Sequence, residues 1–319
     1  MKCSGCDAEV QNDSANCPQC GAVLTAPQDK REITAKLEPK ALEEEWRKKA
    51  PEPLKAQAII KMGARTDLGR VRENNEDKFD FFEPEDDETL AARGSFYAVA
   101  DGMGGHAAGQ IASEMALKTI VASYYADNLG DMDDALLRSV QQANSIIYDT
   151  ARAIVERSGM GTTLTGAAVR GDEIHIIQVG DSRGYLVRDG NIRQVTHDHS
   201  WVAEQVRLGA LTEDEALSSP FRNVITKSLG AAPGVEPDIY TERLEQGDTI
   251  VLCSDGLSGN LSPDDIRETV ADCSPSLAAK KLVDLANARG GSDNITTVVL
   301  HVKEIEKKGK TSRLRRLFQ

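Results

Sequence analysis

Five aspartates stand in short glycine-rich or asparagine-rich contexts far apart along the chain: Asp77, Asp101, Asp181, Asp255 and Asp293. A single Asp-Gly pair is usually only a turn, and each acid taken alone permits that interpretation. Several acids at the ends of apolar runs are harder to explain, because like charges in one cleft repel unless a cation lies between them. Mg²⁺ and Mn²⁺ prefer oxygen ligands of this kind. The set therefore predicts a metal-dependent hydrolase.

Such carboxylates could bridge two metal ions about 3.5–4 Å apart, with a shared hydroxide as the nucleophile for in-line attack on phosphorus. No other nucleophile is evident, since the chain has no GxSxG motif and no CxxxxxR phosphate loop around Cys253 or Cys273. Arg72 could hold the phosphate through two guanidinium N–H groups, although an ordinary surface arginine is the alternative.

Composition excludes several classes of protein. The 319 residues carry a net charge of -13, which argues against a general nucleic-acid binder. No apolar stretch approaches the ~20 residues of a membrane helix, and the segment Met1–Cys6 lacks the apolar core of a signal peptide. We therefore expect a cytoplasmic protein with no integral membrane segment.

Four of the six cysteines form two CxxC pairs, Cys3/Cys6 and Cys17/Cys20. Four thiolates at this spacing match a closed tetrahedral Zn²⁺ site, which would be structural rather than catalytic. A redox dithiol is the alternative, but it needs a CxxC at a helix start in a thioredoxin-like context. Residues 1–22 are therefore predicted to be a small zinc ribbon whose folding free energy comes from the metal.

The rest of the chain divides into three parts. Residues 23–58 are interrupted by prolines and are predicted to be a linker. Residues 59–303 have the pattern of one mixed domain, and residues 304–319 form a basic tail, either solvated or in contact with a partner.

Within the domain, strands cluster and helices come in pairs, which favours a layered α+β fold over alternating βαβ units. The expected strands are 96–100, 163–169, 174–179, 185–188, 249–254 and 296–302. The strands 163–169, 174–179 and 185–188 are predicted to form an antiparallel meander, in which Asp181 could simply close a hairpin. Helices are expected at 107–126, 131–157, 263–271 and 276–289.

Six motifs, taken in order, carry a resemblance to a known family. They are Arg72-Glu-Asn-Asn-Glu-Asp77, Asp101-Gly-Met-Gly-Gly-His106, Gly161-Thr-Thr163, Val179-Gly-Asp-Ser-Arg183, Cys253-Ser-Asp-Gly256 and Gly291-Ser-Asp-Asn-Ile-Thr296. This set strongly resembles the type 2C (PPM) metal-dependent protein serine/threonine phosphatases, and most closely their bacterial branch. The resemblance covers about residues 60–302 and implies an α-β-β-α sandwich of two antiparallel sheets, with the metals at one end.

The resemblance also implies a role for each matching residue. Asp101 would bridge two Mn²⁺ or Mg²⁺ ions and the Gly102 carbonyl would bind the first, while Asp255 and Asp293 would bind the second. Residues of the entry segment and the middle of the domain would assist: Glu76 and Asp77 would support the pair directly or through water, Asp181 would help Asp255 hold a third, weaker metal, and Arg72 would contact the phosphate.

One position departs from many eukaryotic relatives, which carry a histidine after the Asp-Gly pair as general acid. Met103 stands there in this chain, and a thioether cannot donate a proton. Either a metal-bound water or another acid would protonate the leaving oxygen, with His106 as a weak candidate. The segment 196–230 resembles the mobile flap beside the active site, and its His197 and His199 are expected at the surface.

These observations together predict a cytoplasmic phosphatase that removes phosphate from phosphoserine and phosphothreonine of proteins. By resemblance, its substrates would be targets of a serine/threonine kinase in signal transduction, and the zinc ribbon would contact a protein partner. The alternative is a non-catalytic scaffold of the same fold whose ribbon recruits a partner. A nucleic-acid-binding ribbon is disfavoured, because residues 1–22 contain three acids and only one base.

Overall fold

The computed structural model describes residues 2, 3, 6–9, 17–20 and 54–307, except His106 and Asn128. The chain divides into two compact units, Met1–Ala50 and Pro51–Gln319. Most of the predicted linker (residues 23–53), the predicted tail beyond Lys307 and the candidate acid His106 lie outside the described residues. No helix in the described part combines the length and the apolar character that crossing a bilayer requires.

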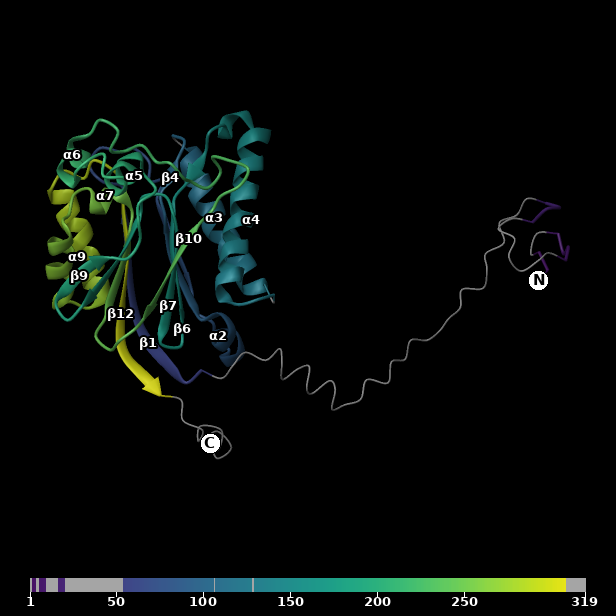
Figure 1. Cartoon of the computed structure of the whole chain (residues 1–319), viewed down its shortest axis with the longest axis horizontal. Coiled ribbons are helices and arrows are strands. Elements are labelled where there is room, and N and C mark those ends of the chain that lie inside the picture. Colours follow the sequence, from purple (N-terminus) through teal and green to yellow (C-terminus); the bar gives the residue numbers. More distant parts are fainter. Residues whose placement is uncertain are drawn as a thin grey trace. The chain divides into compact units, whose positions relative to one another are not determined.

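The larger unit is built on two five-stranded antiparallel sheets (Figure 1). The first sheet has the strand order β1-β12-β11-β8-β9. Its strands are β1 (Ala56–Asp67), β8 (Arg183–Arg188), β9 (Asn191–Gln194), β11 (Thr249–Cys253) and β12 (Ile295–Lys307). The long strands β1 and β12 pair along their whole length, from Ala56 opposite Lys307 to Asp67 opposite Ile295.

The second sheet has the strand order β10-β7-β6-β3-β2. Its strands are β2 (Lys78–Phe82), β3 (Ser95–Ala100), β6 (Leu164–Arg170), β7 (Glu173–Val179) and β10 (Asp238–Arg243). A separate two-stranded ribbon joins β4 (Gly102–Met103) to β5 (Gly161–Thr162). All pairings are antiparallel within the part of the chain that is described.

Helices cover the outer faces of both sheets. The helices are α2 (Asp87–Arg93), α3 (Ala107–Ala126), α4 (Met132–Ala153), the short 3-10 helix η1 (Val155–Arg157), α5 (Trp201–Arg207), α6 (Glu213–Ser218), α7 (Asp255–Ser258), α8 (Pro263–Ala271) and α9 (Pro275–Ala288). The start of α8 has a strong sequence signal: Ser262 and Asp265 form a reciprocal capping box, and Pro263 is the first residue of the helix. Figure 1 shows the strands between α3 and α4 on one side and α9 on the other.

Three apolar clusters join these layers. The first packs α3 and α4 against the second sheet, with Ile120, Leu136 and Ile177 fully buried. The second lies between the sheets and contains residues of both, such as Val99 and Leu252. The third packs α8 and α9 against the first sheet. The predicted arrangement of two antiparallel sheets with outer helices is therefore confirmed.

The predicted meander is wrong at its last strand. Strand β7 pairs with β6 and β10, whereas β8 belongs to the other sheet and pairs with β11 and β9. The short connection crosses between sheets instead of turning back, with Gly180 at φ 103°. The buried Gln178 amide secures the crossing, because its Nε2 donates to the carbonyls of Gly180 at 3.0 Å and Ser182 at 2.6 Å. Asp181 thus does not close a hairpin.

Some boundaries also differ from the sequence-based prediction. Strand β1 begins at Ala56, inside the segment expected to be linker, and β12 continues to Lys307, inside the segment expected to be tail. The helix expected at 131–157 ends at Ala153, where Ile154 adopts an extended conformation before the short helix η1. The short polar strands β9 and β10 were not predicted.

Candidate active site

The candidate carboxylates lie at one end of the two sheets. Asp101 follows β3, Asp255 follows β11 after Ser254, and Asp293 precedes β12. These ends coincide because β11 and β12 are antiparallel, with Cys253 opposite Thr297, and because β2 starts opposite the end of β3. Acids that are far apart in the sequence thereby lie at the same end of the two sheets.

Electrostatic contact among the acids follows from this convergence. The pKa of Asp101 is raised well above its usual value, first by burial of its carboxyl group and then by the charges of Asp77, Asp255 and Asp181. The pKa of Asp255 is also raised by burial and by Asp293, while Arg72 acts in the opposite direction. The five acids therefore share one electrostatic environment.

Asp77 and Asp181 change protonation near neutral pH. Burial raises the pKa of each carboxyl to about 7, and the nearby charge of Asp255 contributes in both cases. Asp77, Asp181 and Asp255 each have one side-chain oxygen that is buried and has no hydrogen-bond partner among the described residues. Unpaired buried oxygens are unfavourable, so each requires a proton or a cation.

Neutral side chains orient these acids. The hydroxyl of Ser254 donates to Asp77 Oδ2 at 2.7 Å and accepts from the backbone N–H of Thr296 at 3.0 Å. The backbone N–H of Asp101 donates to Thr163 Oγ1 at 2.9 Å, and its carbonyl accepts from the N–H of Thr163 at 2.9 Å and from Thr162 Oγ1 at 2.8 Å. The Asp77 carboxylate and the backbone of Asp101 are thus each held by groups that are not acids.

Glycines allow the backbone beside Asp101 to pack closely. A Cβ atom on Gly102 would lie 2.2 Å from the Gly109 carbonyl oxygen and 2.6 Å from the Glu76 carbonyl oxygen. A Cβ atom on Gly109 would lie 1.9 Å from Glu76 Oε2. Helix α3, the turn after Asp101 and the entry segment therefore meet in a space that no larger residue could occupy.

Arg72 lies at the rim of this cluster. Its Nη2 is 2.6 Å from Asp293 Oδ2, and half of its side chain is exposed. This pairing raises the pKa of Arg72, to which the charges of Glu76 and Asp101 also contribute. The guanidinium is therefore near the acids and accessible to a ligand from solvent.

The sequence motifs contain two further residues, Asn294 and Arg183, that hold the site together although their residue types predict no role. Asn294 is 5% exposed; its Oδ1 accepts from the N–H of Glu76 at 2.8 Å and its Nδ2 donates to the carbonyls of Leu68 and Asn74, both at 2.9 Å. Arg183 forms a bidentate pair with Asp198, with its Nη2 2.7 Å from Asp198 Oδ2. Their positions inside the motifs were the only signal in the sequence.

The expectation that both flap histidines lie at the surface is wrong for one of them. His197 is exposed, but His199 is only 6% exposed. His199 Nδ1 accepts from the N–H of Gly180 at 3.1 Å, and its Nε2 lies 3.1 Å from Asp238 Oδ2. The backbone N–H of His199 also donates to the Gly180 carbonyl at 2.8 Å. His199 therefore secures the start of the flap to the residue that precedes Asp181.

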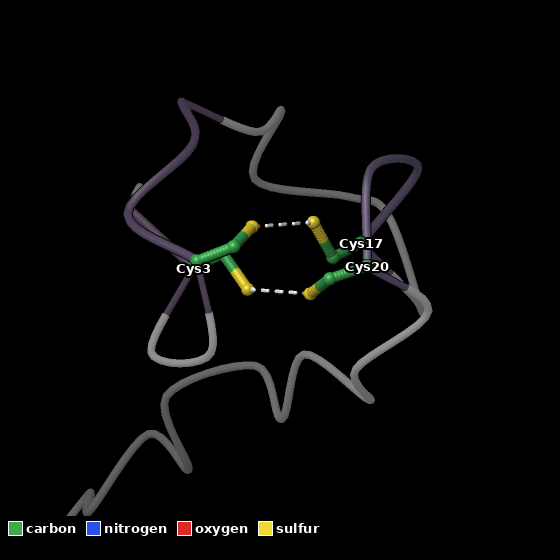
Figure 2. Close-up of side chains that lie close together, drawn as sticks. Cys3, Cys17 and Cys20 are labelled. Atoms are coloured by element: carbon green, nitrogen blue, oxygen red, sulfur yellow. Dashed lines mark hydrogen bonds between the residues drawn. The ribbon is translucent and has the colours of Figure 1, made fainter.

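The first unit brings its four cysteines together. The sulfur atoms of Cys3 and Cys20 are 3.6 Å apart and those of Cys6 and Cys17 are 3.7 Å apart. All four sulfurs lie within 4.8 Å of one another, and Figure 2 shows the thiols facing a common centre. Hydrogen bonds from the backbone of Gln19 and Cys20 lower the pKa of Cys17 to about 6.

The two clusters differ in how they could hold metal. Only the cysteines, among the described residues, place three or more ligand atoms within 4.8 Å of one another, which suits a single ion. The carboxylates are spaced more widely around a shared space. Their donor set is oxygen only and includes three unpaired buried oxygens, which fits more than one hard divalent cation.

Comparisons with known proteins agree with this geometry. The model of one family, described as Protein phosphatase 2C, matches residues 70–288. A putative protein phosphatase 2C-type of Streptococcus pyogenes is 40% identical over 247 residues, which is 76% of this chain and 97% of that protein. The serine/threonine phosphatase stp of Listeria monocytogenes is 36% identical and covers 77% of this chain and 97% of its own.

Solved structures are similar over the same region. The serine/threonine phosphatase of S. agalactiae superposes with a TM-score of 0.71 at 39% identity, covering 76% of this chain and all of that one. The catalytic domain of the serine/threonine protein phosphatase PstP, solved with two manganese ions, has a TM-score of 0.67 at 35% identity. It covers 78% of this chain and all of that one.

Proposed function

Because this chain belongs to the protein phosphatase 2C family and is a protein serine/threonine phosphatase, we propose that its converging acids form a binuclear Mn²⁺ or Mg²⁺ centre. The observation that carries this proposal is the combination of mutual charge, burial and unpaired oxygens at Asp77, Asp181 and Asp255. Like charges buried together are unfavourable without cations, so the site is built for them.

Four residues would bind the metal pair. Asp101 would bridge both ions and the carbonyl of Gly102 would bind the first, while Asp255 and Asp293 would bind the second. When bound, the pair would neutralise negative charge and activate a solvent molecule for attack on phosphorus. Glu76 and Asp77 would support the pair, and Asp181 together with Asp255 would hold a third, weaker ion.

The phosphate would be bound by Arg72. In the structure its guanidinium pairs with Asp293, at 2.6 Å. If Asp293 serves as a metal ligand, the Arg72 guanidinium would be available to a phosphate, because its planar fork matches two phosphate oxygens. Arg72 would then orient the phosphoryl group toward the acids that surround Asp101.

The test is hydrolysis of a phosphothreonine peptide with and without Mn²⁺. We expect Mn²⁺-dependent activity in the native protein and a loss of at least about a hundredfold in Asp101→Asn and Asp255→Asn, because each substitution removes a metal ligand. Asp284→Asn, on the exposed face of α9, is the matched control. Equal activity in the native protein and both active-site variants would reject the assignment of these acids as metal ligands. It would also favour the alternative of a non-catalytic scaffold.

We also propose that the four cysteines of residues 1–22 bind one structural Zn²⁺ and form a small ribbon. The support is the common centre of the four sulfurs and the lowered pKa of Cys17, which favours the thiolate. Native protein should contain one zinc per chain, and Cys3→Ser combined with Cys6→Ser should remove it. Cys273→Ser, in the larger unit, is the control, and an unchanged zinc content in the double variant would refute the site.

The cellular setting is a further part of the proposal. The substrates would be cytoplasmic proteins phosphorylated by a serine/threonine kinase, in signal transduction. The zinc ribbon would contact a protein partner, and the flap of residues 196–230 would influence substrate choice. Comparing phosphoproteins in cells with and without this protein would identify the substrates.

A further inference from the structure

A cavity of about 570 Å³ lies beside the acid cluster, between the end of α4, the segment that follows it and the end of the flap. Met103, Tyr148, Arg152, Met160 and Gly161 contribute to its walls. Nothing in the metal centre or the phosphate contact proposed above uses these side chains. The cavity is therefore separate from the metal ligands, although it is next to them.

One wall of the cavity is formed by residues that follow Asp101 in the chain and by the strand that pairs with them. Met103 follows Gly102 directly, and β4 pairs with β5, so that Met103 lies opposite Gly161. Thr162, the next residue of β5, donates from its hydroxyl to the Asp101 carbonyl at 2.8 Å and pairs on its other side with Leu229 of the flap. A chain that leaves the metal centre past Met103 would therefore enter the cavity.

The shape of the wall depends on glycine. A Cβ atom on Gly161 would lie 2.9 Å from the carbonyl oxygen of Leu229 and 3.5 Å from Met103 Cγ. The absence of a side chain there keeps the cavity open between the ribbon and the flap. The half-buried side chains of Met103 and Tyr148 supply apolar surface on which an extended peptide could lie.

The only charged side chain that lines the described part of the cavity is Arg152. Its Nη1 donates to Tyr148 Oη at 3.2 Å, and its guanidinium lies 5.5 Å from the centre of the Tyr148 ring. Arg152 is exposed and forms no ion pair with a carboxylate among the described residues, in a chain whose net charge is -13. The guanidinium is thus held against the cavity wall, with donors left for an acidic ligand.

We propose that this cavity binds the peptide segment that flanks the phosphorylated residue, and that Arg152 pairs with an acidic side chain of that segment. The inference rests on the phosphatase function and adds a preference to it. Tyr148 would contribute by orienting the guanidinium, while Met103 would contact the apolar part of the same peptide. The acidic side chain lies outside the reacting centre, so its pairing with Arg152 should stabilise the bound substrate and the transition state equally. The pairing should therefore lower KM more than it raises kcat.

The experiment uses full-length protein with Mn²⁺ and a set of phosphothreonine peptides. The neutral peptide has alanine at every flanking position, and each acidic peptide has glutamate in place of alanine at one of these positions. We expect kcat/KM to rise about fivefold at one position or a few adjacent ones, which corresponds to the ~1 kcal/mol of a partly exposed charge pair. In Arg152→Glu the ratio between the acidic and the neutral peptide should fall below one. Arg152→Lys should retain part of the preference, because it keeps the charge but not the planar fork.

Arg243→Glu is the matched control, since it makes the same charge change at the exposed end of β10 and should leave the ratio at its native value. If native protein hydrolyses all peptides equally, the preference does not exist. If Arg152→Glu keeps the native ratio, another group is responsible and the assignment to Arg152 is wrong. Mn²⁺-dependent hydrolysis of the neutral peptide tests the phosphatase function separately, so its failure is distinguishable from failure of the inference.

Discussion

Replacing Asn294 with alanine is a direct test of how the site is held together. The side chain joins three segments: it accepts from the N–H of Glu76 at 2.8 Å and donates to the carbonyls of Leu68 and Asn74 at 2.9 Å. Asn294 also precedes β12 and follows the candidate ligand Asp293. Its loss should therefore loosen the entry segment against the strand that presents Asp293.

The magnitude follows from the groups left without partners. A buried polar group that loses its partner costs about 1–3 kcal/mol. Three groups lose a partner in Asn294→Ala, but they are only partly buried and water can reach some of them, so the low end of the range applies. We expect the metal-free protein to lose about 2–4 kcal/mol in free energy of unfolding, and manganese affinity to fall about tenfold because Glu76 and Asp293 are no longer held in register.

Urea unfolding in EDTA and calorimetric titration with Mn²⁺ measure the two effects. Asn294→Asp should not rescue either one, because it replaces the amide donor with an oxygen facing two carbonyls. Asn191→Ala is the control, since Asn191 is exposed at a hairpin tip and makes only a 3.3 Å contact with Asp189. A destabilisation below about 0.5 kcal/mol in Asn294→Ala, the size of an ordinary surface substitution, would refute the reasoning.

Three further outcomes are expected. The pKa of Asp77 and of Asp181 is raised to about 7, so the folded metal-free protein holds protons that the unfolded chain releases near pH 4. The free energy of unfolding in EDTA should therefore fall as the pH rises from about 5 to 7.5. An increase over that range would contradict this reasoning. Gly109→Ala places a Cβ atom 1.9 Å from Glu76 Oε2 and should raise the Kd for manganese about tenfold, as measured by calorimetry. An unchanged Kd would show that Glu76 can move away from the new methyl group without loss of manganese binding. Arg72→Lys should lower kcat/KM for a phosphopeptide about tenfold to a hundredfold, and native kinetics would exclude a bidentate phosphate contact.

Much of the fold could be predicted because its central elements have strong local signals. The helices expected at 107–126 and 263–271 coincide with α3 and α8, and the expected apolar runs before Asp101 and Asp255 are β3 and β11. Buried strands are almost continuously apolar, and acids that follow them stand out. Convergence of these acids could be inferred, because several like charges at the ends of apolar runs are explained by cations that lie between them.

Other features depend on contacts between distant segments. Strand β8 is as apolar as β7, so the pattern does not reveal that it belongs to the other sheet; the crossing depends on hydrogen bonds from Gln178. The short strands β9 and β10 are mostly polar and half-exposed, and they are held by pairing rather than by their own periodicity. His199 is buried although it lies in a polar loop, because Gly180 and Asp238 supply partners for both ring nitrogens.

Inside the active site, too, some residues can be identified from the sequence and others only from the fold. The acids are identifiable because their number and context are unusual, but they cannot set their own geometry, since charges of one sign drive each other apart. Neutral groups set it: Ser254 fixes Asp77, Thr163 fixes the backbone of Asp101, and Asn294 fixes the segment that carries Glu76. Hydroxyl and amide residues of this kind are common throughout the chain, so nothing in their type distinguishes them before the fold is known. Metal affinity in this protein should therefore depend on these neutral residues as well as on the ligands.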